Sequence, residues 1–264
     1  MKKVLYIFAA VALLFGVASC QKDKDEDPEE NITTQAAGVY NPEMRISKIY
    51  YRYNNDAKKL AETWTWKNNR LIEVQEWTTH YTFSYQSNRL SKIDVDHQNG
   101  ANHTYYSYIY YYEGANLAKI VDTSASEVNT YEYDYKNGKI CSKVETSTFL
   151  ASYKSTYNYT WSGDNLSACK YNFHTPATDK TTNYVYSYDS KKNPYYGGYM
   201  LLFDDMACLS KNNLTKVYSD GKLEAEYSYE YNSKGYPVKK IHTVYNSDGT
   251  IAATHTYYYE YLED

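Results

Sequence analysis

A short phrase that recurs along the chain limits the fold more than any other feature of the sequence. Its clearest copy runs from Tyr131 to Ile140, where three tyrosines alternate with polar residues, a turn follows, and an apolar residue begins the next strand. Alternation with a period of two places the tyrosines on one face of a strand and Glu132 and Asp134 on the other. Asn137-Gly138 supplies the positive-φ turn that folds the strand back. One copy of the phrase therefore predicts one β-hairpin.

Further copies of the phrase follow one another through the rest of the chain. In most copies four residues separate the last aromatic residue from the apolar residue that begins the next strand, so the turn has a fixed geometry. We interpret the long step from Tyr188 to Tyr231 as two units, one of them degenerate. A repeat of this kind predicts antiparallel hairpins in series. The last aromatic residues of the copies are Trp66, Tyr85, Tyr112, Tyr135, Trp161, Tyr188, Tyr231 and Tyr261.

The strand after each turn carries two apolar residues that lie three positions apart. On a flat strand such residues point to opposite faces. We therefore interpret the first as packing at the hairpin end or at a bulge, and the second as facing the core. The pairs are Ile46 and Ile49, Leu90 and Ile93, Leu117 and Ile120, Leu214 and Val217, and Val238 and Ile241.

The composition agrees with an all-β fold. The chain has 264 residues, of which 36 are tyrosines, and tyrosine favours strands. Roughly sixteen strand-like segments lie between Ile46 and Leu262, without an amphipathic helix of full length. A round barrel of that many strands would be about 32 Å across, which tyrosines reaching inward cannot fill. We therefore expect repeated antiparallel hairpins that form a large barrel-like sheet, which is flattened, water-filled or plugged.

A plug candidate occurs where the repeat fails, at residues 193–209. This segment holds the densest apolar run after the N-terminal region and lacks alternation, so we expect a loop and a short helix, roughly Leu202 to Leu209, tucked into one end of the sheet. The alternative is a distorted edge strand. The residues of this segment that we expect to meet a ligand are Tyr195, Tyr196, Asp204 and Asp205. The two adjacent acids are a candidate carboxylate pair, although helix capping or loop bonding suits neighbours in sequence better.

The N-terminus predicts three segments. Residues 1–19 combine Lys2-Lys3 with an apolar run too short for a comfortable membrane span, which is typical of a signal peptide. The residues Val17-Ala18-Ser19-Cys20 resemble the lipobox of bacterial lipoproteins, which implies cleavage before Cys20 and a lipid on its thiol. Residues 20–44 follow as the lipidated cysteine and an acidic tether, and residues 45–264 as the hairpin repeat domain. An uncleaved anchor and an ordinary signal peptide are the alternatives.

The tether is dense in charge between Gln21 and Glu30 and cannot bury apolar area. Its first part, to about Asp27, resembles the export signal of Bacteroidota lipoproteins, a Lys/Asp/Glu-rich stretch after the lipidated cysteine. The resemblance implies an outer-membrane location, lipid-anchored and facing the cell exterior. The alternative is a plain acidic spacer.

A wider resemblance covers residues 40–264. The tyrosine hairpins, the segment Asn193-Pro194-Tyr195-Tyr196-Gly197 and the following Leu209-Ser210-Lys211-Asn212-Asn213 resemble a family of Bacteroidota lipoproteins of unknown function with a porin-like fold. The hairpin phrase is also similar to the tyrosine-aspartate repeats of Rhs-type shell proteins, although an Asp directly after the last Tyr is present only at Asp189. The resemblance implies a barrel-like antiparallel sheet and no known activity.

The residues that usually carry chemistry do not form a recognisable set. We expect no cofactor and no metal, because Asp94, Asp96, His97 and His103 bracket one turn without zinc-type spacing. No phosphate loop, nucleophile elbow or Cys-His pairing is present in the sequence. The net charge of residues 31–264 is −2, obtained from −4 for the whole chain less +2 for the signal and −4 for residues 21–30, which gives no electrostatic case for nucleic acid.

With Cys20 lipidated, three cysteines remain. Cys141 and Cys169 are expected on strands separated by one other strand, about 9.6 Å apart and beyond disulfide reach. The odd count agrees with reduced, buried thiols, while a pairing of Cys208 with either of them stays open.

Three functions are left open by the sequence. The leading hypothesis is a non-catalytic, lipid-anchored surface protein with a binding or structural role, whose partners are the membrane, through its anchor, and a glycan or another surface protein. The second is an outer-membrane channel-like barrel, which the polar face opposite the tyrosines disfavours. The third is a glycan-active enzyme that uses residues of the 193–209 segment. The tyrosine ladders themselves are expected to form the core, and the alternative is that they stack on sugar rings.

Overall fold

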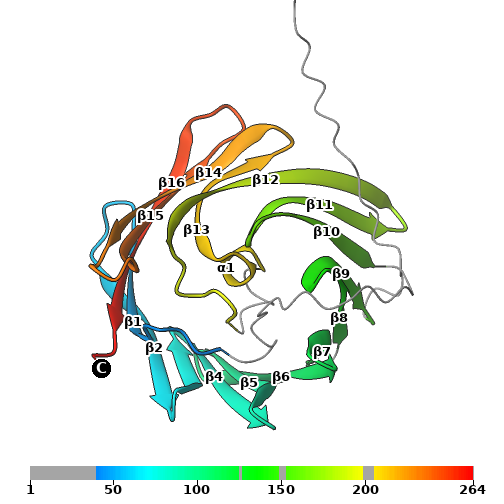
Figure 1. Ribbon diagram of the computed structural model, residues 1–264, viewed down its shortest axis with the longest axis horizontal. Coiled ribbons are helices and arrows are strands. Elements are labelled where there is room, and N and C mark those ends of the chain that lie inside the picture. The colour runs from blue at the N-terminus through cyan, green and yellow to red at the C-terminus, as the bar shows by residue number, and fades with distance from the viewer. Residues whose placement is uncertain (1–39, 125–126, 149–152, 199–204, 264) are drawn as a thin grey trace, which may run out of the picture.

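The computed structural model describes residues 40–124, 127–148, 153–198 and 205–263, with only the backbone described at residues 205 and 206. The strands of this part of the chain close into one antiparallel barrel (Figure 1). Each strand pairs with its neighbours in the sequence, and β1 closes the ring by pairing with β16. The all-β prediction is therefore confirmed. The signal peptide, Cys20 and most of the tether lie outside the described residues.

The strands differ in length, from 7 residues in β3 to 15 residues in β12. Their bounds are β1 Ile46–Tyr53, β2 Lys59–Lys67, β3 Arg70–Glu76, β4 Thr79–Gln86, β5 Arg89–Asn99, β6 Asn102–Glu113, β7 Asn116–Thr123, β8 Val128–Lys136, β9 Lys139–Ser147, β10 Lys154–Ser162, β11 Asn165–Thr175, β12 Thr178–Lys192, β13 Asn212–Ser219, β14 Lys222–Tyr231, β15 Pro237–Tyr245 and β16 Ile251–Tyr261. A short helix, α1 (Asp205–Leu209), lies between β12 and β13.

The repeated turns all lie at one end of the barrel, which we call the turn end. It comprises the connections β2–β3, β4–β5, β6–β7, β8–β9 and β10–β11. The turn of the clearest copy is formed as predicted, because Asn137 and Gly138 have φ angles of 51° and 70°. The opposite end, which we call the mouth, includes the turns at residues 77–78, 220–221 and 246–250.

A β-bulge follows most of the repeated turns. Tyr85 pairs with Leu90, and the next pairing skips Ser91. The extra residue brings Leu90 and Ile93 onto the same inner face, where 0% and 1% of their surfaces are exposed. The prediction that the second apolar residue faces the core is confirmed, and the bulge makes the first do so as well. The same shift occurs at Trp66, Tyr112, Tyr135 and Trp161.

The last aromatic residue of a phrase also bonds to the preceding hairpin. Tyr112 Oη donates to the carbonyl oxygen of Leu90 at 2.7 Å, and Tyr85 Oη donates in the same way to Leu71 at 2.6 Å. These bonds satisfy the hydroxyl of a ring that is otherwise packed in the core, and they tie neighbouring hairpins together around the turn end. Equivalent bonds join Trp66 to Ile46, Trp161 to Ile140 and Tyr261 to Pro237, while in the phrase that ends at Tyr231 the preceding ring, Tyr229, bonds to Leu214.

The interior is packed at the turn end and more open toward the mouth. The fully buried apolar side chains come from the first residues after the repeated turns, as at Leu71, Leu117 and Leu166. Rings that face inward farther from the turn end, such as Tyr81 on β4 and Tyr184 on β12, are only half-buried. The tyrosine phrases thus face the barrel interior as predicted, with the acids between them on the outer face.

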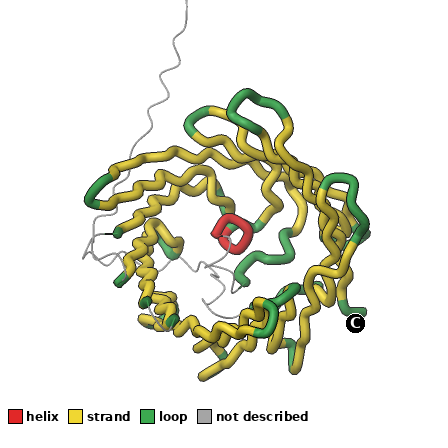
Figure 2. Tube along the Cα trace, turned by 180° about the vertical axis from the view of Figure 1, so that it is seen from behind, coloured by secondary structure: helices red, strands yellow, loops and turns green. Residues whose placement is uncertain are grey.

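The connection between β12 and β13 enters the barrel, where Figure 2 shows α1 inside the ring of strands. The interpretation of the step from Tyr188 to Tyr231 as two repeat units is wrong, because a single hairpin, β13 and β14, completes it. Residues 193–211 supply the additional length. The predicted plug and short helix are confirmed in position, with α1 ending at Leu209 as expected, while residues 202–204 of the predicted helix lie outside the described part.

One strand departs from the predicted face pattern. The turn between Tyr231 and its partner Pro237 is one residue longer than in the clearest copies, and the bulge falls at Val238. A shift of one residue exchanges the faces of a strand. Ile241 therefore lies on the outer face, and its neighbours in sequence, Lys240 and His242, face the lumen. The prediction that Val238 and Ile241 form a core pair is wrong for this reason.

Candidate functional site

The lumen has a floor, which is the segment that plugs the turn end. Asn193 holds this segment in place: its side-chain nitrogen donates to the carbonyl oxygens of Ala207 and Ser210, the latter at 2.8 Å, and its side-chain oxygen accepts from the Tyr195 N–H at 3.0 Å. Tyr40 reaches the floor from the other direction and donates from its hydroxyl to the Pro194 carbonyl. The floor is therefore fixed by hydrogen bonds from residues far apart in the sequence.

Tyr195 occupies the centre of the floor. Its ring centroid lies 6.2 Å from that of Trp64 on β2 and 6.3 Å from that of Tyr259 on β16. Burial raises the pKa of its hydroxyl well above the ordinary value. Gly198 permits the close turn below it, because a Cβ at this position would lie 2.8 Å from the Tyr195 carbonyl oxygen.

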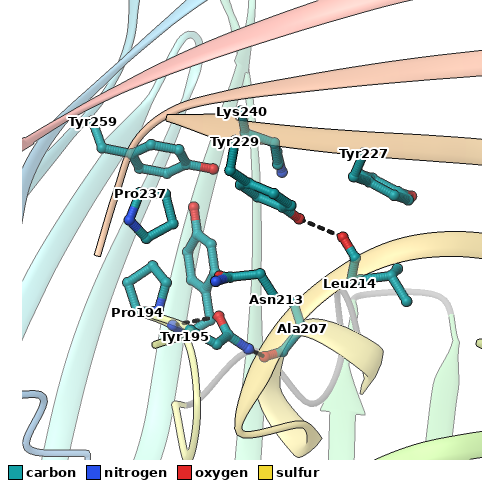
Figure 3. A pocket seen from close by; sticks show the side chains of 11 residues that line it. Pro194, Tyr195, Ala207, Asn213, Leu214, Tyr227, Tyr229, Pro237, Lys240 and Tyr259 are labelled. Carbon is teal, nitrogen blue, oxygen red and sulfur yellow. Dashed lines mark hydrogen bonds between the residues drawn. The ribbon is translucent and has the colours of Figure 1, made fainter. Parts of the chain in front are cut away.

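A small cavity of about 50 Å³ lies directly against the floor. In Figure 3 the side chains of Tyr195, Tyr229 and Tyr259 surround it, with Lys240 and Tyr227 on the strand side. Tyr229 donates its hydroxyl proton to the Leu214 carbonyl at 2.7 Å, which fixes that ring. The volume suits one or two waters rather than a larger molecule, so the floor itself offers no room for an organic ligand.

A continuous series of rings runs along the lumen wall from the floor cavity to the mouth. His242 stacks on Tyr227 with a centroid distance of 4.4 Å and an angle of 12°. His242 also lies 5.4 Å from His255, its direct partner across β15 and β16. His255 in turn lies 5.9 Å from Tyr51, whose hydroxyl is 2.7 Å from His255 Nδ1. The next ring of the series is Trp77, edge-on to Tyr51 at 6.3 Å.

We call this series, together with Tyr53, the aromatic platform. Tyr53 belongs to it because its ring lies 5.4 Å from His255. The platform is exposed where it reaches the mouth, with 52% of Trp77 and 41% of Tyr53 accessible to solvent. The members are Tyr227, His242, His255, Tyr51, Tyr53 and Trp77.

Trp77 has an unusual backbone conformation. It occupies the two-residue turn between β3 and β4 with a φ of 42°, a region that glycine adopts freely and that bulky residues rarely adopt. The turn is held by its N–H, which donates to the Ala61 carbonyl at 3.1 Å. The Gln75 side chain bonds to the Trp77 and Thr79 carbonyls at 3.3 and 3.2 Å. Such over-determined strain is a feature of functional sites.

Two carboxylates flank the platform. Glu62 and Glu76 lie directly opposite each other across β2 and β3, and both follow the inward-facing alternation of Trp64 and Val74. Glu62 accepts a hydrogen bond from Trp64 Nε1 at 2.8 Å, and Glu76 accepts one from Tyr81 Oη at 3.2 Å. Burial, together with the nearby Glu76 charge, raises the pKa of Glu62 to about 7.

A basic group faces the same part of the lumen. Lys240 Nζ lies 4.2 Å from the ring centroid of Tyr257. Burial and the neighbouring Lys240 charge lower the pKa of His242 to about 4, and burial also lowers the pKa of His255. Both imidazoles are therefore neutral at physiological pH. The platform thus combines apolar ring faces with carboxylate acceptors, one ammonium donor and neutral polar rings.

The residues predicted to meet a ligand are described only in part. Tyr195 is half-buried in the floor, and Tyr196 is 37% exposed. Asp204 lies outside the described residues, and Asp205 begins α1, where only the backbone is described. The platform was not predicted, because Lys240 and His242 were assigned to the wrong face of β15. The alternation of Trp66 and Trp64 continues to Glu62, and that pattern was available in the sequence.

The residues considered for a metal site bond in separate pairs and do not converge on one point. Asp96 and His103 bond at 2.8 Å on exposed strand positions, while His97 bonds to Thr79 at 2.9 Å. Asp94 is engaged by Lys92 and by Ser107, each at 2.6 Å. Among the described residues no group of three or more His, Cys, Asp and Glu side chains is placed to bind a metal ion.

Cys169 and Cys208 are buried free thiols. Cys141 lies on β9 and Cys169 on β11, with β10 between them as predicted. Cys141 is disulfide-bonded, so the expectation of a reduced thiol is wrong at Cys141. In the described residues, helix α1 is too short to cross a membrane and no other segment forms a long apolar helix.

Fold and site together define a closed antiparallel barrel with an inserted floor and a ring-lined lumen. No family model and no curated protein matches the sequence. The chain is similar in structure to a porin-like protein from Bacteroides vulgatus ATCC 8482, with a TM-score of 0.43 and 10% sequence identity over 84% of this chain and 100% of the other.

Two further solved structures show similarity at the same low level. One is a porin-like protein from Bacteroides uniformis ATCC 8492, with a TM-score of 0.39 and 13% identity over 82% of this chain and 98% of the other. The other is a chain of the TcdB2-TccC3 structure, with a TM-score of 0.34 and 15% identity over 82% of this chain and 13% of the other.

Proposed function

We propose that the protein is a non-catalytic lipoprotein, attached to the outer membrane by a lipid on Cys20 and facing the cell exterior, whose barrel binds a ligand in its lumen. The observation that carries the proposal is the asymmetry of the barrel interior. The turn end is closed by the floor, where Tyr195 packs between Trp64 and Tyr259, whereas Trp77 and Tyr53 are exposed at the mouth. Exposed aromatic side chains beside convergent polar groups are typical of binding sites.

The position of Tyr40 supports an orientation for the anchored barrel. Tyr40 is 3% exposed and packs against Trp66 at the turn end, with ring centroids 5.6 Å apart. The chain that precedes it, and with it the anchor at Cys20, therefore joins the barrel at the closed end. A barrel held from this end presents its mouth away from the membrane, where a ligand can reach the aromatic platform.

The outer face supports an anchored barrel over a channel that spans the membrane. Ion pairs cross between neighbouring strands on this face, as between Lys216 and Glu226 at 2.9 Å and between Lys239 and Glu230 at 2.7 Å. A barrel in a bilayer presents an apolar band outward, and charges at its centre are destabilising. The floor would also block passage through the lumen.

The anchor is tested by labelling cells with a palmitate analogue. The wild-type chain is expected to incorporate the label, and Cys20→Ala to lose it and to be released from the membrane fraction. Label that persists on Cys20→Ala would contradict the lipid anchor. Resistance of the wild type to protease added to intact cells would contradict the exterior location.

The barrel is tested with residues 32–264, which include every strand of the closed ring. We expect a folded, β-rich monomer in buffer without detergent, measured by gel filtration and circular dichroism. A protein that folds only in detergent and conducts ions in planar bilayers would replace this proposal with a channel.

A glycan-active enzyme is the second candidate, and the opposed Glu62 and Glu76 favour it. Two carboxyl groups on one wall, one with a raised pKa, are the groups that glycoside hydrolysis requires. Release of reducing sugar from polysaccharides by the wild type, lost in Glu76→Gln, would establish it. Unchanged polysaccharides after prolonged incubation would leave binding as the function.

A further inference from the structure

The aromatic platform indicates the chemical class of the ligand as well as the place where it binds. This inference rests on the function proposed above. Its rings are not arranged as a closed core, because Trp77 and Tyr53 present exposed surface at the mouth. The inner rings, from His255 to Tyr227, continue the platform toward the floor. A ligand that follows these rings must therefore be extended and must carry apolar faces.

The polar groups beside the platform require a ligand rich in hydroxyl groups. Glu62 and Glu76 are hydrogen-bond acceptors, while the Lys240 ammonium is a donor only. The neutral rings of His242 and His255 can each donate and accept. A hydroxyl group does both, so a ligand with many hydroxyls can satisfy every one of these groups, which an apolar or an aromatic ligand cannot.

The charges around the platform disfavour an anionic ligand. Burial raises the pKa of Glu62 to about 7, the histidines are held neutral, and Lys240 is the basic side chain that acts on Glu62. One ammonium group beside two acidic side chains leaves no surplus of positive charge at this wall. An anionic polymer would therefore gain no net attraction, and it would place like charges together in a partly desolvated site.

The strain at Trp77 indicates that its ring is retained for a purpose other than folding. The turn position with φ of 42° is one that glycine would occupy without strain. The ring is more than half exposed and contributes little burial. A bulky residue at such a position is a cost in stability, which is expected where the side chain serves binding.

From these observations we propose that the lumen binds a neutral carbohydrate chain, with sugar rings stacked on Trp77, Tyr53 and Tyr51 and hydroxyl groups bonded to Glu76 and Glu62. Trp77 lies at the mouth and makes the first contact. The inner rings Tyr227 and His242 then receive the end of the chain above the floor cavity.

The test is affinity gel electrophoresis of the full-length protein in mild detergent, with gels that contain dextran, laminarin, mannan or xylan. At least one of these neutral polysaccharides is expected to retard the wild type. Trp77→Gly is expected to weaken the retardation about tenfold, the equivalent of one lost aromatic contact. Because glycine suits the turn, this variant is expected to unfold at the same temperature as the wild type or higher, which separates loss of binding from loss of folding.

Tyr105→Ala is the matched control, since Tyr105 is 65% exposed but stacks on His103 away from the platform. It is expected to be retarded like the wild type. Tryptophan fluorescence gives a second readout: of the four tryptophans, Trp77 is the one with an exposed ring. The polysaccharide should protect the wild type from acrylamide quenching and leave Trp77→Gly unaffected.

Three results would overturn the inference: no retardation of the wild type by any of the four polysaccharides, equal retardation of wild type and Trp77→Gly, or retardation only by the polyanions polygalacturonate and heparin. The anchor is judged separately. Polysaccharide binding by a wild-type protein that carries no lipid label would refute the anchor alone. A labelled, non-conducting barrel that ignores all four polysaccharides would refute the carbohydrate alone.

Discussion

His242 lies directly opposite His255 across β15 and β16, with ring centroids 5.4 Å apart and Tyr227 stacked on the far side of His242. This arrangement leaves His242 neutral, with a pKa of about 4 that burial and the Lys240 charge produce. The unfolded chain binds a proton at about pH 6.5. The barrel therefore loses stability as the pH falls from about 6.5 through 4, because protonation favours the unfolded chain.

His242→Gln should remove most of this acid sensitivity. The difference in the free energy of unfolding between this variant and the wild type should be about 2 kcal/mol more favourable to the variant at pH 4 than at pH 7.5, allowing for partial exposure of the ring. The measurement is urea unfolding at a series of pH values. His174→Gln, at an exposed position on β11, is the control and should leave the profile unchanged. An identical profile for His242→Gln would contradict the assignment.

Glu62 should show the opposite dependence on pH. Its pKa is raised to about 7 by burial, so the folded protein binds the proton more tightly than the unfolded chain does. Stability is then full below the unfolded pKa, near 4.3, and declines as the pH rises through 7. Glu62→Gln keeps an acceptor for Trp64 and should stabilise the barrel by about 2 kcal/mol at pH 8, with little effect at pH 4. Glu260→Gln, on the exposed outer face, is the control, and a stability difference that does not vary with pH would disprove the mechanism.

The hydrogen bonds around the turn end should contribute measurably to stability. Tyr112→Phe removes the bond to the Leu90 carbonyl, keeps the ring, and is expected to cost about 1 kcal/mol. Tyr111→Phe changes the neighbouring tyrosine, which is 46% exposed, and should cost less than about 0.5 kcal/mol. Denaturant unfolding compares the two variants. Equal stability of the two variants would mean that the hydrogen bonds to carbonyl oxygens at the turn end do not stabilise the protein.

The residues that the bulges turn inward should be the most sensitive positions of the wall. Leu90→Ala removes a side chain that is 0% exposed and should cost about 2–5 kcal/mol. Leu60→Ala affects a leucine that is 47% exposed near the mouth and should cost about 0.5 kcal/mol or less. A small effect at Leu90 would indicate that the turn end is loosely packed.

Asn193 should stabilise the floor without contributing to the stability of the barrel wall. Asn193→Ala removes two donated bonds and one accepted bond, leaves buried carbonyls unpaired, and should destabilise the floor by about 2–4 kcal/mol. Hydrogen exchange should therefore accelerate in residues 193–198 and 205–211 while β5 and β6 keep their protection. Asn232→Ala provides a control at the neighbouring β14–β15 turn. Uniform acceleration over the whole barrel would show that the floor and the wall unfold together.

The regular part of the fold could be predicted from the sequence because it depends on local rules. Alternation set the inward face of the tyrosines, and Asn137-Gly138 set a turn of the expected type. The closure of the ring could not be derived in this way, since the pairing of Ile49 with Tyr259 joins opposite ends of the chain. Local patterns contain no information about which distant strand becomes the neighbour.

The site was harder to predict than the fold because it consists of departures from the pattern. One additional residue before Pro237 turned Lys240 and His242 inward. Trp77 occupies a turn position for which the sequence rules would select glycine. Places where local rules fail are the expected places for function, and both departures lie on the same wall of the lumen.

The closure of β1 against β16 makes the two ends of the barrel chain neighbours. Leu262 N–H donates to the Arg45 carbonyl at 2.8 Å, beside the pairing of Ile46 with Tyr261. The seam thus has the geometry of one more hairpin that lacks only its connecting turn. A four-residue linker could supply that turn, and the chain could then be opened at residues 86–89 to give a circular permutant with the same ring of strands. The ring of strands would then not depend on the order in which the hairpins follow one another along the chain.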